Sequence, residues 1–454
     1  TNIFSSNVTN EFRFNITLPE QLTKAEIDSF GGANPTKITD FDGLSETDWA
    51  LFSYRVNSFP GFWLNPQINR QRQINIVNNL TFIKGRHTFK TGGDWRHLRT
   101  SSSLPEFYQT PFYYNQDQLL KNTPQLFTGY RSVGDMAPVY KNFSLFLQDE
   151  WKVSSRLNLS LGVRWEWSPA PRDANGNQPA TVNQLDNIAT MTALWRTTYN
   201  NFAPRIGLAY RLNDSANYGT VLRTGTGLFH DTSTVQASEG YWYGLGITGT
   251  INLNNKPFPL TAEELRNIPA PTYELAPSAY AQIFAFDPNL KMPFVLQWNA
   301  TIEQQLGSKH SLTVSYVGSN ARRLLLGRQY YPENVNNPAF PPGSSYVYGT
   351  TNRGTSSYNA LQTQFRRHLS KGLQVIASHT WSHALDLATV NFTSTVFERA
   401  SSNYDIRHNF QTALSYELPG SYNNPFLSGL LAGWGLDTRI SARSAMPVDI
   451  IAAT

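Results

Sequence analysis

The sequence predicts an all-β protein, an antiparallel up-and-down transmembrane β-barrel with long extracellular loops. Three observations support this prediction: polar and apolar residues alternate over long segments, short and long connections alternate along the chain, and aromatic residues gather near the ends of the alternating segments. A period of two is typical of strands that have two chemically different faces. A tilted strand of roughly 9–11 residues can cross a bilayer, and the alternating segments reach this length.

The alternating segments pair into hairpins in chain order. Residues 142–167 show this best. On each side of a short polar turn, from Phe143 to Trp151 and from Leu157 to Trp167, the odd-numbered residues are apolar with one exception. Asp149 interrupts that apolar parity opposite Leu161, so we expect a bulge or a cross-strand hydrogen bond to turn its carboxylate away from lipid. About thirteen strands are expected, one near 8–16 and then the pairs 74–82 and 87–99, 143–153 and 157–167, 206–212 and 222–228, 298–306 and 312–316, 361–369 and 373–381, and 410–418 and 434–440.

The connections between these segments differ strongly in length. One end of each hairpin closes with roughly three to ten residues rich in Ser, Gly, Asn and Lys, whereas the other end opens into long segments. Short periplasmic turns and long outer loops are typical of membrane barrels. A soluble β-sandwich would also alternate, but its strands usually have about five or six residues. The long connections are 100–141, 168–200, 230–292, 319–357 and 383–406.

Composition excludes several other classes of protein. Charged residues make up 15% of the chain, against about 25% in soluble domains. No run approaches the roughly 18 apolar residues of a transmembrane helix. There is no cysteine, which rules out disulfides and thiolate metal sites, and the net charge of +5 is too dispersed to predict a nucleic-acid partner.

Several segments, in this order, resemble the barrel of TonB-dependent outer-membrane receptors, and most of all their Oar-like branch. They are FLQDEWKVSSRLNLSLGVRWE, NFAPRIGLAYRLND, VLQWNATIEQQLGSKHSLTVSYVGS, YNALQTQFRRHLSKGLQVIASHTWSHALD and YDIRHNFQTALSYELP. The resemblance covers nearly the whole chain and implies a 22-stranded barrel filled by an N-terminal plug domain, which carries a box that engages the TonB energy-transducing complex. It also implies a place in the bacterial outer membrane, with lipid, the plug, TonB and a ligand as partners.

The sequence departs from that family pattern in its extent. Only about thirteen strands are expected, with no plug and no TonB box, and an open sheet of this kind would expose two bare edges in lipid. We therefore expect residues 1–454 to be a partial receptor barrel whose N-terminal plug and terminal strands are missing.

Three sets of residues are candidates for contacts with the surroundings. The membrane-interface aromatics are Trp151, Trp165, Trp167, Trp298, Trp381 and Trp434. Polar residues expected to face the lumen are Glu150, Lys152, Arg164, Glu166 and Arg366, either to hydrate the wall and contact the plug or to take part in substrate passage. Aromatic side chains suited to grip a ligand from the loops are Tyr108, Tyr113, Tyr114, Tyr241, Trp242 and Tyr243.

No catalytic or cofactor site emerges from the motifs. The glycines at 244–249 have the spacing of a dinucleotide fingerprint. No strand-to-helix unit surrounds them, so we do not expect a nucleotide site there. Residues 172–177 match the first half of a calcium loop but lack its distal Glu, so a polar turn is preferred and a weak external Ca²⁺ site remains open. His379 and His383 would lie roughly 13 Å apart on a strand, too far to share a metal. We expect no cofactor, no metal and no enzymatic activity.

Three functions are considered. The first is TonB-dependent transport of a large ligand, a peptide, a protein or an oligosaccharide, that the extracellular loops capture. The second is a structural or adhesive outer-membrane barrel that transports nothing. The third is a secreted β-rich glycosidase, which would be expressed in soluble form without detergent.

Overall fold

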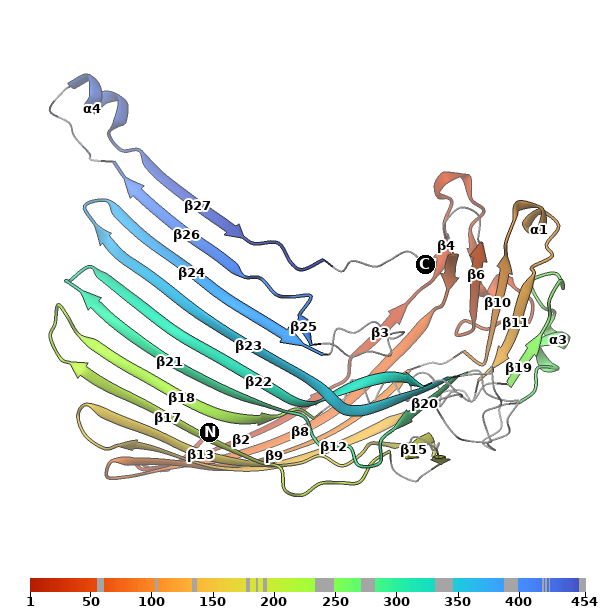
Figure 1. Cartoon of the computed structure of the whole chain (residues 1–454), viewed down its shortest axis with the longest axis horizontal. Coiled ribbons are helices and arrows are strands. Elements are labelled where there is room, and N and C mark those ends of the chain that lie inside the picture. Colours follow the sequence, from red (N-terminus) through yellow and green to blue (C-terminus); the bar gives the residue numbers. More distant parts are fainter. Residues whose placement is uncertain are drawn as a thin grey trace.

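The computed structural model describes residues 1–54, 61–102, 105–132, 137–176, 180–184, 187–190, 194–232, 249–270, 282–330, 346–387, 399–418, 420, 423 and 425–448. These residues form a curved 20-stranded sheet, a five-stranded sheet and a two-stranded ribbon (Figure 1). No helix in this part of the chain is long and apolar enough to cross a membrane.

The large sheet is an up-and-down meander. Within the described ranges it contains thirteen strands of nine residues or more, the number expected, and each pairs antiparallel with the next. In order they are β2 (Val8–Thr17), β8 (Gln67–Lys84), β9 (His87–Ser102), β12 (Pro138–Lys152), β13 (Leu157–Trp167), β17 (Phe202–Asn213), β18 (Thr220–His230), β21 (Phe294–Leu306), β22 (His310–Tyr330), β23 (Tyr346–Ser370), β24 (Leu373–Asp386), β26 (His408–Glu417) and β27 (Gly435–Arg443).

Short segments extend this sheet at its margins. They are β1 (Asn2–Ser5), β3 (Glu20–Thr23), β14 (Arg172–Asp173), β15 (Ala180–Gln184), β16 (Asn187–Thr190), β20 (Gln282–Phe286) and β25 (Ala400–Ser401). In the part of the chain that the structure describes, β2 and β27 do not pair with each other, so the sheet is open.

Short turns gather at one end of the strands and long connections at the other (Figure 1). Three of the short turns use left-handed glycines, with φ of 60° at Gly85, 69° at Gly307 and 73° at Gly372. Gly85 and Gly372 lie in two-residue turns, which require such backbone angles because they match the right-handed twist of the strands, whereas Gly307 begins a three-residue turn. The turn chemistry therefore determines the register of these hairpins.

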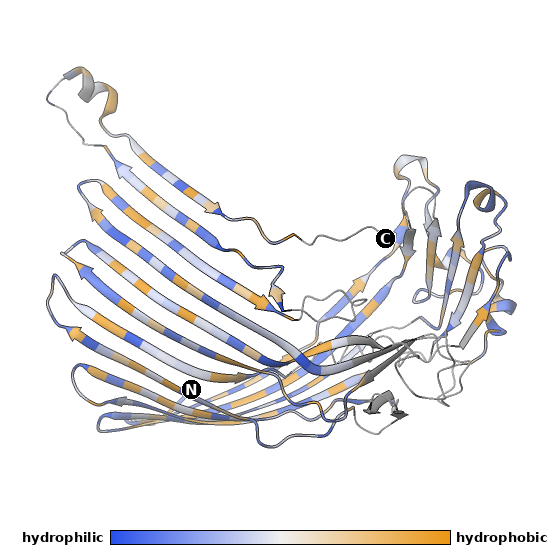
Figure 2. Ribbon diagram, in the orientation of Figure 1, coloured by the Kyte–Doolittle hydropathy of each residue, from blue (hydrophilic) through white to orange (hydrophobic). Residues whose placement is uncertain are grey.

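The two faces of the large sheet differ as the alternation predicts, and Figure 2 shows the alternating bands. One face carries a broad set of exposed apolar side chains, which we call the lipid face. Its members include Phe12, Phe14, Leu145, Leu147, Leu161, Val163, Ile206, Leu296, Ile302, Leu361, Leu436 and Ile440. The opposite face, which we call the lumenal face, carries mainly polar residues, and Ser144 is nearly fully buried there.

Two glycines allow aromatic rings to lie on the sheet. Phe146, the one large apolar side chain on the lumenal parity of its hairpin, pairs with Gly92, where an added Cβ would approach its ring to 2.8 Å. On the lipid face Trp298 pairs with Gly318, where an added Cβ would come within 2.3 Å of the indole. Each ring covers the backbone of the glycine opposite it, which has no side chain of its own.

Two of the long connections expected from the sequence, 100–141 and 230–292, contain strands, and together with the connection between β2 and β8 they build a second sheet. Its strands are β6 (Trp49–Tyr54), β7 (Gly61–Leu64), β10 (Phe107–Tyr113), β11 (Leu126–Arg131) and β19 (Gly249–Asn252). A core that includes Phe127, Leu260 and Ile268 packs beneath it, and we call this unit the loop sheet. Its connections hold α1 (Gln116–Leu120), α3 (Ala262–Arg266), the ribbon β4 (Glu26–Ile27) and β5 (Thr36–Lys37), and the 3-10 turns η1 (Phe30–Gly32) and η2 (Ile38–Asp40).

Buried polar side chains join the three connections. Asp48 accepts the Phe107 backbone N–H at 2.7 Å and so ties the first connection to the second. Gln109 accepts the Leu260 N–H at 2.9 Å and ties the second to the third. Because each side chain satisfies a buried backbone donor, the loop sheet depends on contacts between segments that lie far apart in the sequence.

Candidate functional site

The lumenal face contains a compact polar network around Arg164. This guanidinium contacts the carboxylate of Glu166, donates from Nη2 to Ser144 Oγ at 2.5 Å and lies 3.7 Å from Asp94. Asp94 in turn accepts a hydrogen bond of 2.6 Å from Asn75 Nδ2. The charges of Arg164 and Glu166 are therefore compensated within the wall, which favours a structural or plug-contacting role for them over direct binding of a ligand.

The other predicted lumenal residues lie closer to the short turns. Glu150 accepts hydrogen bonds of 2.7 Å from Gln148 Nε2 and from Ser160 Oγ. Lys152 is exposed where β12 ends, and Arg366 is exposed on β23 near its turn. The structure therefore separates these residues from the Arg164 network instead of bringing all five together.

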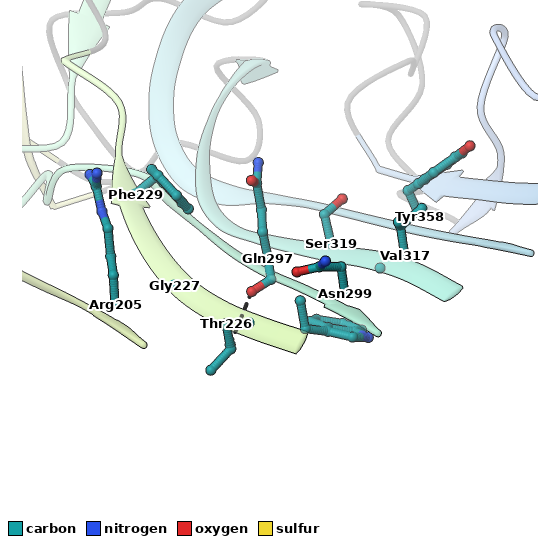
Figure 3. Close-up of a pocket in the computed structure, with 12 residues that line it drawn as sticks. Arg205, Thr226, Gly227, Phe229, Gln297, Asn299, Val317, Ser319 and Tyr358 are labelled. Atoms are coloured by element: carbon teal, nitrogen blue, oxygen red, sulfur yellow. Dashed lines mark hydrogen bonds between the residues drawn. The ribbon is translucent and has the colours of Figure 1, made fainter. Parts of the chain in front are cut away.

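A hollow of about 580 Å³ opens farther along the strands, and we call it the wall hollow. Figure 3 shows the side chains of Arg205, Gln297, Asn299, Ser319 and Tyr358 on one side of the sheet and Thr226 on the other. Five neighbouring strands contribute to it, β17, β18, β21, β22 and β23. Its volume falls within the range of ligand-binding clefts.

Glycines create the wall hollow. Gly225 and Gly227 stand on the lumenal parity of β18, where a Cβ on Gly225 would lie 3.3 Å from Asn299 Oδ1 and one on Gly227 would lie 3.0 Å from Arg205 Cγ. Any larger residue at these positions would fill the floor of the hollow. Glycine inside a strand weakens it and often marks a close approach, so this pair was the sequence signal for a site that the alternation alone did not reveal.

Arg205 is the single cation among the side chains that line the wall hollow. Its guanidinium lies 4.2 Å from the ring centroid of Phe229, a cation–π contact. Among the described residues no carboxylate forms an ion pair with it. The hollow thus offers one stacked cation surrounded by amide and hydroxyl groups, which suits a polar ligand with carbonyl, hydroxyl or anionic groups.

The predicted interface tryptophans lie at two levels of the strands. Trp165, Trp298 and Trp381 each stand eight residues from the turn-side end of their strand, whereas Trp151 and Trp434 lie beside short turns. Trp167 lies two residues beyond Trp165. Eight residues at about 3.3 Å span roughly 26 Å along a strand, and a tilt of about 40° lowers this to roughly 20 Å of membrane depth. Contact with lipid headgroups at both levels stays a prediction.

Asp149 has the cross-strand hydrogen bond that the sequence predicted. Its Oδ2 lies 2.7 Å from Nδ1 of His87, which belongs to the neighbouring strand β9. The imidazole stacks between Phe89 and Trp151, with centroid separations of 5.4 and 5.1 Å. Asp149 also pairs with Leu161 in the predicted register. The carboxylate is therefore turned into an aromatic cluster near the short turn.

The loop tyrosines occupy different environments. Tyr108 stacks on Tyr130 across the loop sheet, with centroids 4.0 Å apart and rings 2° from parallel. Tyr113 is buried, and its hydroxyl donates to Asn122 Oδ1 at 2.8 Å. Burial raises the pKa of Tyr113 to about 12, and this position favours a structural role. Tyr114 is half-buried beside α1, and Tyr241, Trp242 and Tyr243 lie outside the described residues.

The histidines at 379 and 383 have separate partners. His379 Nε2 lies 3.3 Å from His408 Nδ1, whereas His383 Nδ1 lies 3.1 Å from Asp405. Arg407 also contacts Asp405, at 3.0 Å. Within the described ranges no group of three or more His, Cys, Asp or Glu residues gathers in a metal-binding arrangement.

Solved structures of outer-membrane proteins are similar to this chain. The outer membrane transporter YddB from Escherichia coli is 10% identical and superposes with a TM-score of 0.51 over 97% of this chain. The copper transporter OprC is 12% identical, with a TM-score of 0.47 over 91% of this chain. The chain covers 53% and 48% of those proteins, so it spans about half their length. No curated protein matches it.

The family comparison agrees with the fold. The family described as outer membrane beta barrel domain matches residues 1–454, the whole chain. The family match assigns the chain to outer-membrane barrels, which contradicts the alternative of a secreted glycosidase. The resemblance to receptor barrels is confirmed at this level, while the Oar-like branch stays a prediction. The chain therefore belongs to the outer-membrane β-barrel domain family and is located in the bacterial outer membrane.

Proposed function

We propose that the chain is part of a TonB-dependent transporter that moves a large ligand, a peptide, a protein or an oligosaccharide, across the outer membrane. The wall hollow is the observation that carries this proposal. It lies on the lumenal face at the level of Trp298 and exposes polar side chains to the lumen. Adhesion alone would not require a polar hollow inside the wall.

The chemistry of the hollow supports a polar polymer as ligand. Gln297 and Asn299 can both donate and accept hydrogen bonds, as peptide groups and sugar hydroxyls require. A space of about 580 Å³ would hold only a small part of such a ligand. The remainder would reach the loop sheet, where Tyr108, Tyr114 and the segment 241–243 are our candidates for capture.

The energy for transport would come from the rest of the receptor. We propose that an N-terminal plug, supplied outside these 454 residues, occupies the lumen of a 22-stranded barrel and is moved by the TonB complex. Glu150, Lys152, Arg164, Glu166 and Arg366 would then contact this plug or hydrate the wall around it. The similarity to the outer membrane transporter YddB, of which this chain covers about half, supports a transport role for the barrel.

Uptake by cells tests the proposal. Cells that produce the full-length receptor are given a fluorescent casein digest or a fluorescent dextran, both larger than porins admit. We expect uptake of one of the two classes, and we expect it to disappear when TonB is deleted. Uptake that does not require TonB, or surface retention of both probes without entry, would contradict transport, and retention would support the adhesive alternative.

A substitution then tests the hollow itself. Arg205→Ala should lower uptake about tenfold or more, because a charged hydrogen bond contributes about 1.5–3 kcal/mol. Arg223→Ala is the matched control, because Arg223 lies on the same face but is bound to Glu303 at 2.9 Å outside the hollow. Equal uptake by both variants would show that the ligand does not use the hollow.

A further inference from the structure

The connection between β26 and β27 differs from the turns of the other hairpins that join two long strands of the large sheet. No charged residue occurs from Leu418 to Leu436, a stretch of 19 residues that contains α4 (Pro425–Leu431). The turns of the other five hairpins between long strands each contain a charged residue within the turn itself: Arg86, Arg156, Asp214, Lys309 and Lys371. In the β26–β27 hairpin the nearest charges are Glu417 and Asp437, which lie on the strands.

Large apolar side chains are exposed along this connection. The exposed fractions are 76% for Phe426, 56% for Leu430 and 67% for Trp434. Phe426 and Leu430 are four residues apart and therefore lie on one side of α4. Figure 2 shows hydrophobic colour on this helix, at the tip of the hairpin.

The exposed side chains continue the lipid face. The Leu418 N–H donates to the Trp434 carbonyl at 2.9 Å and closes the hairpin directly below the helix. On the lipid-facing parity of β27, Trp434 is followed by Leu436, Thr438 and Ile440, and the two apolar residues are 55% and 54% exposed. Exposed apolar side chains are therefore found both on the lipid face of the last strand and on α4.

We propose that α4 and Trp434 form an interfacial anchor that lies in the headgroup region of the periplasmic leaflet, with Phe426 and Leu430 turned toward the acyl chains. Its partner is the phospholipid surface. Exposed apolar side chains strengthen binding at the membrane interface in proportion to the apolar area that they bury, and tryptophan is enriched at the same depth. The charged turns, in contrast, extend into the periplasm. This inference rests on the outer-membrane location and not on the proposed transport.

The absence of cysteine makes a direct test available. Leu430→Cys and, as a control, Lys309→Cys are introduced singly into the full-length receptor, with any cysteine outside these residues replaced, and labelled with an environment-sensitive fluorophore in phospholipid vesicles. At position 430 we expect a blue-shifted emission that nitroxide lipids quench several-fold more strongly than iodide does. At position 309 we expect the opposite order.

Two outcomes would overturn the proposal. A label at 430 that iodide quenches as strongly as one at 309 would place the connection in water. A label protected from both quenchers would place it against protein. Phe426→Ser, made in the Leu430→Cys background, should shift quenching toward iodide, and the mobility of the unheated protein in gels verifies that each variant has formed its barrel.

Discussion

The Nδ1 of His87 lies 2.7 Å from Asp149 Oδ2 on the lipid face, between two strands of the large sheet. A lone carboxylate exposed to hydrocarbon would be costly, and the cost falls toward the interface. The aromatic rings of Phe89 and Trp151 enclose the pair close to the short turn. The position therefore holds a hydrogen-bonded pair on the lipid face, in which His87 is the partner of the Asp149 carboxylate.

Removal of the imidazole should destabilise the barrel. We expect His87→Ala to lower the free energy of unfolding by about 1–3 kcal/mol, because it leaves the partly buried Asp149 carboxylate without its partner. Asp149→Leu in the same background should recover much of this loss. Denaturant unfolding in vesicles measures both, with His97→Ala on the same strand as control. A loss no greater than that of His97→Ala would contradict this account.

Gly318 should accept no side chain while Trp298 lies on it. Gly318→Ala brings a methyl group within 2.3 Å of the indole, so the ring must leave the sheet, and overpacking of this kind costs about 1–3 kcal/mol. Tryptophan fluorescence and vesicle unfolding would report the change. Gly327→Ala on the same strand is the control, because an added Cβ there meets nothing within 4 Å. Equal effects at the two glycines would disprove the contact.

Alternation predicted the large sheet well, because the period of two encodes the faces of each strand. It correctly placed Asp149 opposite Leu161. The wall hollow was missed because the predicted hairpin of β17 and β18 had no assigned register, and it is the register that sets Gly227 opposite Arg205. The loop sheet was missed because β10 pairs in parallel with β6, almost sixty residues earlier, and no local pattern reports such a contact.

High pH should loosen the loop sheet. The pKa of Tyr113, about 12, lies above its ordinary value of 10, so the neutral phenol stabilises the fold. This contribution is complete below about pH 10 and is lost as the pH rises toward 12. Near-ultraviolet circular dichroism across this range should show the loss in the wild-type protein.

The variant Tyr113→Phe separates this effect from general alkaline unfolding. Without the hydrogen bond to Asn122, the loop sheet should be about 1 kcal/mol less stable at neutral pH. It should also lose less stability than the wild-type protein between pH 10 and 12. Tyr199→Phe, a change at an exposed ring, is the control. If the alkaline transition of Tyr113→Phe is the same as that of the wild-type protein, the transition is caused by groups other than Tyr113.

Asn352 lies on β23 and should fix the segment that precedes β21 to the hairpin of β22 and β23. Its Oδ1 accepts the Lys291 N–H at 2.6 Å, and its Nδ2 donates to the carbonyls of Lys291 and Arg323 at 2.9 and 2.8 Å. Arg323 has a left-handed φ of 58° at a bulge in β22, so one amide joins the bulge to the incoming chain. A bulge without this partner should open more readily.

Hydrogen exchange measures the role of Asn352. Asn352→Ala should increase exchange several-fold at residues 287–292 and around the bulge, because three hydrogen bonds are lost together. The membrane-spanning parts of β21 and β22 should keep their protection, since their ladder is untouched. Arg353→Ala, a change at the exposed neighbouring residue, should leave all of these regions as they are. If both variants exchange alike, residues 287–292 do not depend on Asn352. They are then held by the hydrogen bond of 3.0 Å that the Asp287 N–H donates to the Thr350 carbonyl.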